Sequence, residues 1–410
     1  MSGHSCRFCG RHLQHTFADL GVSPLANSYV PRERAQQAEA HYPLCAYVCD
    51  ECLLVQLPVF ESAEQIFSDY TYFSSYSDSW LDHCRRYAEK MIERFGLDRS
   101  NRIIEIASND GYLLQYFKER DIPVLGIEPA ANVAEVAQHK GIETVVTFFG
   151  SRTAEDMSAR NVQADLLIGN NVLAHVPDIN DFVQGLKMIL KPQGIITMEF
   201  PHVMRLIEEN QFDTIYHEHF SYFSMLAVKQ IFEAHGLAII DVDELPTHGG
   251  SLRIYACHLE GKDPDERSRV QELIAKEKKA GLHLLESYSS FHQKILTSKR
   301  SILSFMIQAK QEGKSVVGYG APAKGNTLLN YCGIGPDFID YTVDRNPHKQ
   351  GCFLPGSRIP IYSPDRVKET RPDYLVILPW NLREEIMTQM SHVRQWGGKF
   401  VTLIPEVDVF

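Results

Sequence analysis

The sequence lacks the features that mark several classes of protein. Its 410 residues contain no apolar run near the roughly 20 residues that a helix needs to span a bilayer, and no basic stretch followed by an apolar one at the start. Lysine and arginine (41) are fewer than aspartate and glutamate (52), and the formal charge of −11 argues against a general nucleic-acid binder. Low-complexity segments and short repeats are also lacking. We therefore expect a cytoplasmic globular protein, monomeric or weakly oligomeric, without membrane or nucleic-acid partners.

Length and composition fit a protein of several domains. At roughly 150 residues per domain, the chain has room for two to three, and its 44% of apolar residues is average for globular proteins. Changes in patterning along the chain place the boundaries near residues 65 and 260. We expect three domains, over residues 1–65, 66–260 and 261–410.

Two stretches of the chain alternate between strand-like and helix-like segments. Such alternation is typical of a parallel sheet covered by helices. The first stretch ends in two apolar runs, 237–245 and 251–259, whose connecting PTHGG predicts an antiparallel hairpin at the sheet edge. The sequence thus predicts two doubly wound α/β units. Their expected parallel strands are 102–107, 124–128, 165–169 and 194–200 in the central unit, and 315–320, 338–344, 374–378 and 399–405 in the C-terminal unit.

Cysteine is unevenly distributed, because five of the nine residues lie before residue 53. Cys6 and Cys9 form one C-x-x-C pair, and Cys49 and Cys52 form another, so that four thiolates can surround one ion. Four sulfur ligands in a closed site suit structural Zn²⁺, which contributes to folding and not to chemistry. The 39 residues between the pairs exceed the usual spacing, which leaves buried free thiols as the alternative. Cys45 stands outside the paired pattern.

The loop after the first central strand, EIASNDG at 105–111, lacks the G-x-G-x-x-G that holds a dinucleotide pyrophosphate. It resembles the first motif of class I methyltransferases, which binds S-adenosylmethionine. Glu128, at the end of the next strand, is placed to accept hydrogen bonds from ribose hydroxyls. Phe148 and Phe149 either flank the adenine or belong to the core. The expected cofactor-binding residues are Glu105, Ala107, Ser108, Asn109, Asp110, Gly111, Glu128, Pro129, Asn170 and Asn171.

A second polar cluster, TIYHEHFSYFS, lies at residues 214–224. Its H-E-H invites a metal interpretation, but it lacks the i, i+4 histidine pair that places two imidazoles on one helix face. A histidine beside a carboxylate is also typical of acid/base catalysis, because its pKa lies near working pH. Metal binding, packing and catalysis all stay open on the residues alone, and catalysis is favoured.

As a whole, the sequence resembles the nucleotide-sugar C-methyltransferases of deoxysugar biosynthesis, of which the 3-C-methyltransferases acting on 4-keto-deoxyhexoses are the best-known members. The resemblance covers nearly the whole chain. It implies a zinc-binding domain, a Rossmann-like S-adenosylmethionine domain and a second Rossmann-like α/β domain. The motifs that carry it are the four paired cysteines, EIASNDG at 105–111, NNVLAHV at 170–176, YHEHFSY at 216–222, HGGSLR at 248–253 and GYGAPAKGN at 318–326.

The family also implies a mechanism. A base removes the hydrogen on C3, beside the 4-keto group, and the carbon of the resulting enolate takes the methyl group. By resemblance, His219 is the base, Tyr216 stabilises the enolate oxygen and Glu218 orients neighbouring groups. His175 and Tyr70 match further polar residues of the family's active site. The zinc is expected to be structural and distant from this chemistry.

The C-terminal loop GYGAPAKGN, at 318–326, lies between an expected strand and an expected helix. Its backbone N–H groups, helix start and lysine suit a diphosphate, although a tight structural turn is the alternative. In the family this domain helps to hold the nucleotide sugar, for which precedent favours dTDP. The expected substrate-binding residues are His248, Lys324, Asn326 and Asn381.

Two other functions fit parts of the sequence. NAD(P)-dependent nucleotide-sugar oxidoreductases also contain α/β units, but the loop at 105–111 lacks their glycines. A zinc-ribbon scaffold with an inactive methyltransferase fold is the third hypothesis. The acidic charge and the intact Tyr216, Glu218 and His219 argue against it. The sequence therefore favours the C-methyltransferase.

Overall fold

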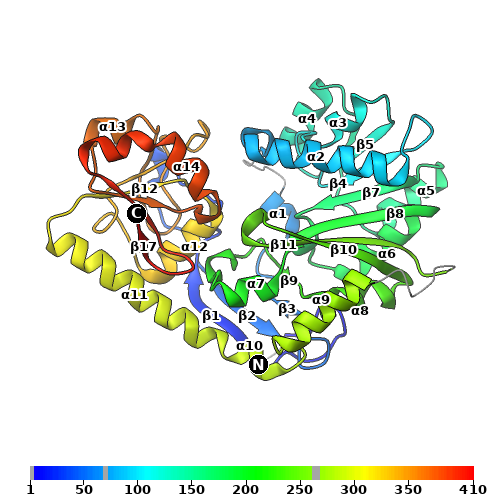
Figure 1. Ribbon diagram of the computed structural model, residues 1–410, viewed down its shortest axis with the longest axis horizontal. Coiled ribbons are helices and arrows are strands. Elements are labelled where there is room, and N and C mark those ends of the chain that lie inside the picture. The colour runs from blue at the N-terminus through cyan, green and yellow to red at the C-terminus, as the bar shows by residue number, and fades with distance from the viewer. Residues whose placement is uncertain (1–3, 68–72, 261–267) are drawn as a thin grey trace.

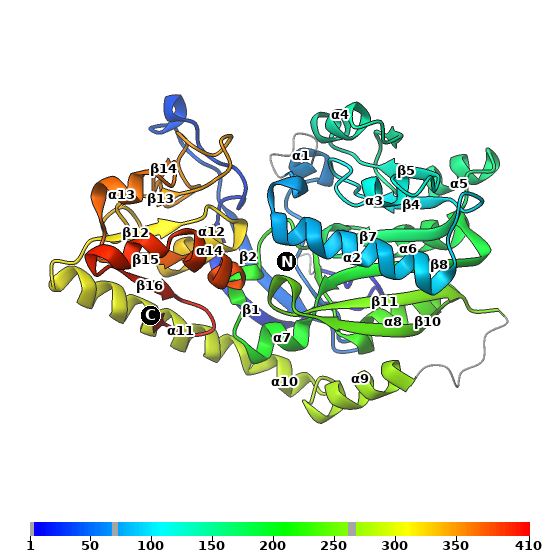
Figure 2. The same ribbon diagram turned by 45° about the horizontal axis from the view of Figure 1, so that its top comes forward.

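The computed structural model describes residues 4–67, 73–260 and 268–410, which build three sheets joined by helices. The N-terminal sheet has four strands, the central sheet seven and the C-terminal sheet six. Figures 1 and 2 show the central and C-terminal units side by side, with the N-terminal sheet between them. Tyr70, an expected active-site residue, lies outside the described residues.

The N-terminal sheet is completed by a strand from the middle of the chain. Its antiparallel strands pair in the order β1-β2-β3-β9, so that Val55 and Gln56 pair with Tyr222 and Ser221. The motif YHEHFSY is thereby attached to the cysteine-rich region. The elements of this part are β1 (His15–Ser23), β2 (Tyr42–Val48), β3 (Val55–Gln56), α1 (Ala63–Phe67) and β9 (Ser221–Tyr222).

The central unit confirms the predicted parallel sheet with a hairpin at its edge. Its strands are β4 (Ile103–Ile106), β5 (Val124–Ile127), β6 (Thr144–Val145), β7 (Ala164–Asn170), β8 (Leu190–Pro201), β10 (Leu237–Leu245) and β11 (Ser251–His258). They follow the order β10-β11-β8-β7-β4-β5-β6, and only β11 runs opposite to the others, pairing antiparallel with both β10 and β8. Every residue of β4 is buried, as expected for a strand covered by helices on both faces.

The helices of the central unit follow its strands in alternation. Those before β8 are α2 (Asp78–Phe95), α3 (Leu114–Lys118), α4 (Ala131–His139), α5 (Ser151–Ala159) and α6 (Ile179–Ile189). Those after it are α7 (Val203–Glu208) and α8 (Met225–Ala234). The longest of them, α2, begins at an N-cap, because the Ser77 side chain accepts a hydrogen bond from the Trp80 backbone.

The C-terminal unit is a second doubly wound sheet. Its strands are β12 (Val316–Tyr319), β13 (Thr342–Val343), β14 (Ile361–Tyr362), β15 (Tyr374–Ile377), β16 (Lys399–Thr402) and β17 (Asp408–Val409), and its helices are α12 (Ala323–Cys332), α13 (Arg366–Thr370) and α14 (Arg383–Gln389). The order is β14-β13-β12-β15-β16-β17, and only β17 is antiparallel. The strand expected at 338–344 is shorter, because Phe338 and Ile339 first turn back onto Gly335.

Three helices connect the central and C-terminal units: α9 (Ser268–Lys279), α10 (Leu285–Ser289) and α11 (Phe291–Gln311). The long helix α11 packs against β1 and α12, as its diagonal course in Figure 1 shows. One hydrophobic core runs from Phe17 of β1 through Phe291 and Ile302 of α11 to Val316 of β12. The N-terminal sheet is thus packed firmly onto the C-terminal unit. Across the described residues, no helix has the length and apolar character that a membrane span requires.

Candidate active site

A cavity of about 820 Å³ is lined by residues of all three parts of the chain. The carboxyl ends of β4, β5 and β7 reach it from the central unit, and the loops after β12, β13 and β15 reach it from the C-terminal unit. Ligands of open α/β sheets bind at this edge. Two ligand-binding edges therefore share one cavity.

The loop after β4 is shaped by Glu128, the acidic residue that follows β5. One Glu128 oxygen accepts the backbone N–H of Asn109 at 2.9 Å, and the other accepts that of Ala130 at 2.9 Å. Ala107 and Asn109 adopt positive φ angles of 56° and 49°, which turn the loop tightly around this carboxylate. Each oxygen keeps a second lone pair, so Glu128 can still accept ribose hydroxyls. Ala107, Asn109, Glu128 and Pro129 line the cavity.

Several buried polar atoms at this edge have no hydrogen-bond partner among the described residues. They include Ser108 Oγ, Asn170 Oδ1, Asn171 Oδ1 and both carboxylate oxygens of Glu105. Burial raises the pKa of Glu105 well above its usual value. Unsatisfied polar groups are rare in a folded interior. Their concentration here fits a polar, positively charged ligand such as S-adenosylmethionine.

The predicted cofactor residues divide between the cavity wall and the layer behind it. Asn170 and Asn171 line the wall, as do Phe148 and Phe149, and the Phe149 ring also makes an edge contact with Phe182 at 5.4 Å. Phe149 therefore lies in the cavity wall and also packs against a buried ring, and its contact with adenine stays a prediction. Four of the predicted cofactor-binding residues do not line the described part of the cavity: Glu105, Ser108, Asp110 and Gly111.

His219 lies in the wall as a neutral imidazole with a fixed tautomer. Its Nδ1 lies 2.9 Å from the carbonyl oxygen of Thr214, which can only accept, so Nδ1 carries the proton. Its Nε2 therefore presents a lone pair, to which the Tyr216 hydroxyl donates at 2.9 Å. Burial and the neighbouring His175 hold the pKa of His219 well below its usual value. The base form is thus present throughout the neutral range.

The side chains of the two residues that precede His219 point elsewhere. His217 contacts the carbonyl oxygen of Pro43 at 3.1 Å, in the N-terminal sheet. The Glu218 side chain is buried and does not line the described part of the cavity, and burial raises its pKa to about 7. Its carbonyl oxygen accepts a hydrogen bond from His175 Nδ1 at 2.8 Å. The side chains of H-E-H diverge, which disfavours the metal interpretation of this motif.

His175 and His248 complete the histidine cluster around the cavity. The His175 ring lies 4.8 Å from that of His219 at 67°, and burial lowers the pKa of His175 to about 4. His248 has a positive φ of 55°, and its Nε2 accepts a hydrogen bond from Asn171 Nδ2 at 3.0 Å. Burial, aided by Lys324, lowers the pKa of His248 to about 4. All of these imidazoles are therefore uncharged at neutral pH.

The C-terminal wall carries most of the cationic side chains, and α2 adds Arg86. Lys324 donates to Asn381 Oδ1 at 2.8 Å and lies 4.5 Å from the centre of the Trp380 ring. Burial lowers the pKa of Lys324, and the nearby Asp213 opposes this shift. Lys324 and Asn381 line the cavity as predicted, whereas the Asn326 amide points to the carbonyl oxygen of Ala26 at 2.7 Å and does not line its described part. Within the loop at 318–326, Lys324 is the charged side chain that lines the cavity.

Sequence reasoning missed several residues of the wall. Trp80 and His83, on α2, stack with ring centres 5.0 Å apart, and Trp80 also lies 5.3 Å from His248. In the sequence, Trp80 is recognisable only as an apolar residue on one face of an amphipathic helix. The other overlooked wall residues are Asn27, Asp344, Arg345 and Lys349.

His83 rests on a buried ion cluster below the wall. Glu199 forms an ion pair with Arg253, lies 3.0 Å from His83 Nε2 and accepts a hydrogen bond from Thr247 at 2.7 Å. Burial alone would raise the pKa of Glu199, but Arg253 and His83 lower it to about 2. A carboxylate that is ionised at all working pH values thus anchors α2, β8 and β11 beneath the cavity.

The four paired cysteines converge as the sequence predicts. Their Sγ atoms all lie within 4.8 Å of one another, with 3.6 Å between Cys6 and Cys52 and 3.5 Å between Cys9 and Cys49. Sulfurs at about 2.3 Å from a central Zn²⁺ stand about 3.8 Å apart in a tetrahedron, so this arrangement fits the ion. Cys45 lies outside the group.

Comparison with known families accounts for nearly the whole chain. Three family models match consecutive stretches: a zinc binding domain over residues 6–67, a methyltransferase domain over 80–242 and a C-methyltransferase C-terminal domain over 246–405. The predicted class I methyltransferase fold and the zinc site are thereby confirmed. S-adenosylmethionine is the cofactor that this fold and the buried polar edge at β4 call for.

The chain is similar to the C-methyltransferase NovU of Streptomyces niveus, with 36% identity over 98% of this chain and 95% of NovU. A ubiquinone biosynthesis O-methyltransferase of Rhodopseudomonas palustris is 29% identical over 24% of this chain and 38% of its own length. Among solved structures, the magnesium protoporphyrin IX methyltransferase of Synechocystis PCC 6803 with bound S-adenosylmethionine has 12% identity and a TM-score of 0.33, covering 43% of this chain and 79% of its own. The likeness to NovU favours methyl transfer over the oxidoreductase and the inactive scaffold.

Proposed function

The chain belongs to the C-methyltransferases, and we propose that it methylates C3 of a nucleotide-linked 4-keto-6-deoxyhexose. The observation that carries this proposal is the neutral His219, whose Nε2 lone pair lies in the wall of a cavity shared by two ligand-binding edges. A carbon beside a ketone becomes a nucleophile only after a base has removed its proton. His219 is placed to act as that base.

Proton removal and charge stabilisation involve two residues that touch each other. His219 Nε2 takes the proton from C3, and the charge of the product imidazolium is shared with Thr214 through Nδ1. The hydroxyl of Tyr216, which donates to Nε2 at 2.9 Å in this structure, turns to the enolate oxygen that develops at C4 and so leaves the Nε2 lone pair free for the C3 proton. His175 keeps His219 in place by ring contact at 4.8 Å.

The methyl donor belongs at the β4 edge. S-adenosylmethionine supplies a methyl group on a positively charged sulfur. Glu128 is placed to accept the ribose hydroxyls, Phe148 to cover the adenine, and Asn170 and Asn171 to accept hydrogen bonds through their unsatisfied oxygens. Glu105 supports the loop from behind.

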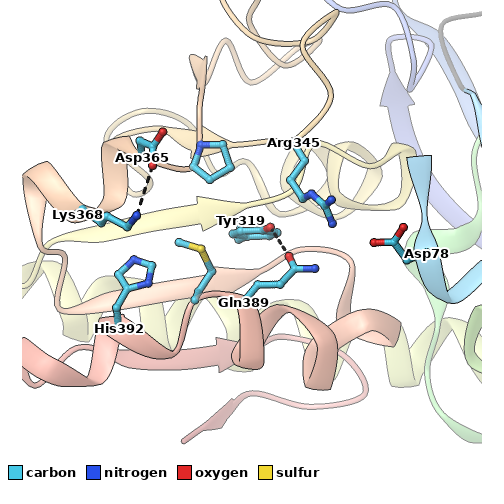
Figure 3. Close-up of a pocket in the computed structure, with 9 residues that line it drawn as sticks. Asp78, Tyr319, Arg345, Asp365, Lys368, Gln389 and His392 are labelled. Atoms are coloured by element: carbon cyan, nitrogen blue, oxygen red, sulfur yellow. Dashed lines mark hydrogen bonds and ion pairs between the residues drawn. The ribbon is translucent and has the colours of Figure 1, made fainter. Parts of the chain in front are cut away.

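The nucleotide belongs on the C-terminal side, where Lys324 is placed to contact the diphosphate. A second pocket of about 410 Å³ adjoins the cavity and shares Tyr319, Arg345 and Gln389 with it (Figure 3). The Tyr319 hydroxyl donates to Gln389 Oε1 at 2.9 Å, which holds both side chains at the border of the two pockets. This pocket suits the nucleoside, for which the family resemblance favours thymidine. Binding energy from this remote group can then position the small sugar for reaction.

The test is to incubate the zinc-loaded protein with S-adenosylmethionine and a panel of dTDP- and GDP-linked 4-keto sugars. We expect mass spectrometry to show the gain of one methylene and NMR to place it on C3. His219→Asn should lower turnover by about 10²- to 10⁴-fold, because a general base contributes that much, with S-adenosylhomocysteine affinity unchanged. Without the methyl donor, the wild type should exchange the C3 hydrogen with solvent deuterium, and the variant should not.

Methylation at an oxygen, or wild-type turnover by His219→Asn, would contradict the proposal. A thermal-shift control separates the remaining alternative. Stabilisation by NADH but not by S-adenosylhomocysteine would point to an oxidoreductase.

A further inference from the structure

The cysteine-rich region contributes a polar side chain to the active site. Asn27 lies between β1 and β2 and lines the cavity. Its amide nitrogen lies 2.8 Å from each carboxylate oxygen of Glu218. Glu218 is 2% exposed. Among the described residues, the side-chain hydrogen bonds to its carboxylate come from Asn27. A residue of the zinc-binding region therefore stands between the motif carboxylate and the cavity.

This contact determines how a buried carboxylate is held. An amide N–H donates and cannot accept a proton, so an N–H shared by the two carboxylate oxygens favours the ionised form and holds the carboxylate in place. Burial works in the opposite direction and raises the pKa of Glu218 to about 7, while Asn27 and the positive charge of Lys349 lower it. The other titratable groups near this contact are Tyr29, Asp344, His175 and His219.

The contact continues to the C-terminal unit through Tyr29. Its hydroxyl lies 3.2 Å from Asn27 Oδ1 and 2.5 Å from the carbonyl oxygen of Ala321. The same carbonyl oxygen accepts Lys349 Nζ at 2.8 Å, and the backbone N–H of Ala321 donates to Asp344 at 2.7 Å. A polar chain thus connects the catalytic motif, the zinc-binding region and the loop that follows β12.

Glu218 in turn supports the catalytic histidines. Its carbonyl oxygen holds His175, and the next residue in the chain is His219. A change in the conformation of the Glu218 side chain therefore shifts the backbone next to His219, the proposed base. Misplacement by about 1 Å can cost about a hundredfold in rate.

We propose that Asn27 is a positioning residue of this methyltransferase: its amide holds the Glu218 carboxylate in one orientation and links it, through Tyr29, to the loop at Ala321. The catalytic part of this inference rests on the proposed function. The zinc-binding region then has a second task besides folding, because it completes the support of the active site.

The experiment compares Asn27→Ala and Asn27→Asp with the wild type, each as full-length protein with its zinc content verified. Asn27→Ala should lower kcat by about tenfold to a hundredfold at every pH, with S-adenosylhomocysteine affinity unchanged. In Asn27→Asp, two carboxyl groups face each other and must share a proton, which raises the pKa of one of them. Its kcat should therefore be nearer to wild type at about pH 6 and fall relative to wild type towards about pH 8.5.

Thermal melting gives a readout that needs no sugar substrate. In Asn27→Asp, the raised pKa of the carboxyl pair stabilises the fold at low pH, and this stability is lost as pH rises through that pKa. The difference in Tm from wild type should therefore grow with pH in both variants, and more steeply in Asn27→Asp, because Asn27→Ala only removes a hydrogen bond that lowers the pKa of Glu218. Ser28→Ala, at the exposed neighbouring residue, is the matched control and should leave both readouts unchanged.

Each outcome decides a part of the inference. Wild-type kcat in Asn27→Ala overturns the positioning role, and equal, pH-independent losses in both variants show a merely structural role. If the wild type methylates none of the 4-keto sugars, the proposed function fails together with the catalytic part. The melting curves still decide whether Asn27 controls the charge of Glu218.

Discussion

The central and C-terminal units share one architecture but present opposite charges to the cavity between them. In the central unit, an acidic residue after β5 accepts a backbone N–H from the loop after β4. In the C-terminal unit, an acidic residue after β13 accepts a backbone N–H from the loop after β12. Glu128 accepts Asn109 at 2.9 Å, and Asp344 accepts Ala321 at 2.7 Å. The same turn is therefore built twice, at equivalent edges of the two sheets.

The difference lies in what surrounds each turn. The central edge places the Glu128 carboxylate in the wall, and no cation of the described residues contributes to its pKa. The C-terminal edge instead adds Lys324, Lys349 and Arg345. A sulfonium donor fits the first environment and a diphosphate fits the second. The backbone provides the binding position, and the side chains select the sign of the ligand.

We expect the largest effect on both binding edges from removal of the zinc, because the N-terminal sheet packs against both units. Cys6→Ser should lose the metal and unfold this sheet, since a structural zinc contributes on the order of 10 kcal/mol to folding. Elemental analysis should show less than one zinc, and circular dichroism should show a large fall in Tm. Both S-adenosylhomocysteine and nucleotide should then bind poorly.

The matched control for zinc removal is Cys352→Ser. Cys352 is half-buried in the C-terminal unit and stands outside the cysteine cluster. This variant should keep its zinc and its Tm. A correctly folded, metal-free Cys6→Ser protein with wild-type Tm would contradict the structural role of zinc.

The second prediction tests the charge difference directly by a reciprocal pair of variants. Lys324→Gln should weaken the nucleotide by about 10- to 100-fold, because a charge-assisted hydrogen bond contributes about 1.5–3 kcal/mol. It should leave S-adenosylhomocysteine affinity unchanged. Glu128→Gln should do the reverse by a similar factor. Isothermal titration of both ligands against both proteins gives four affinities, and equal losses of both ligands in either variant would mean that the two edges are not separate.

The sequence predicts the elements of this comparison better than their contacts. Strand and helix alternation, the C-x-x-C pairs and the loop at 105–111 are local patterns, and the structure confirms them. Asn27 and Trp80 reach the cavity only because distant segments pack together, which no local pattern encodes. Lys324 and Asn326 were expected at one ligand, but residues two apart on a helix point about 200° apart, so one faces the cavity and the other faces Ala26.

The smallest expected effect concerns Asp213, which joins the two units where they meet. Its carboxylate accepts a hydrogen bond from Trp380 Nε1 at 2.8 Å, and burial raises its pKa from 3.8 to about 6 against the opposing charge of Lys324. Because the folded state holds this proton more tightly, the associated stability is present at low pH and is lost as pH rises from about 4 to about 6.

Asp213→Asn keeps an acceptor for Trp380 and removes the titration. A shift of this size corresponds to at most about 3 kcal/mol, so the fall in Tm over that pH range should be smaller in the variant by a few degrees. Asp337→Asn, at an exposed aspartate of the C-terminal unit, should follow the wild-type curve. If the two curves run parallel, the pKa of Asp213 is the same in the folded and unfolded states, and burial does not raise it. If wild type instead gains stability relative to Asp213→Asn as pH rises, Asp213 is held ionised by Lys324.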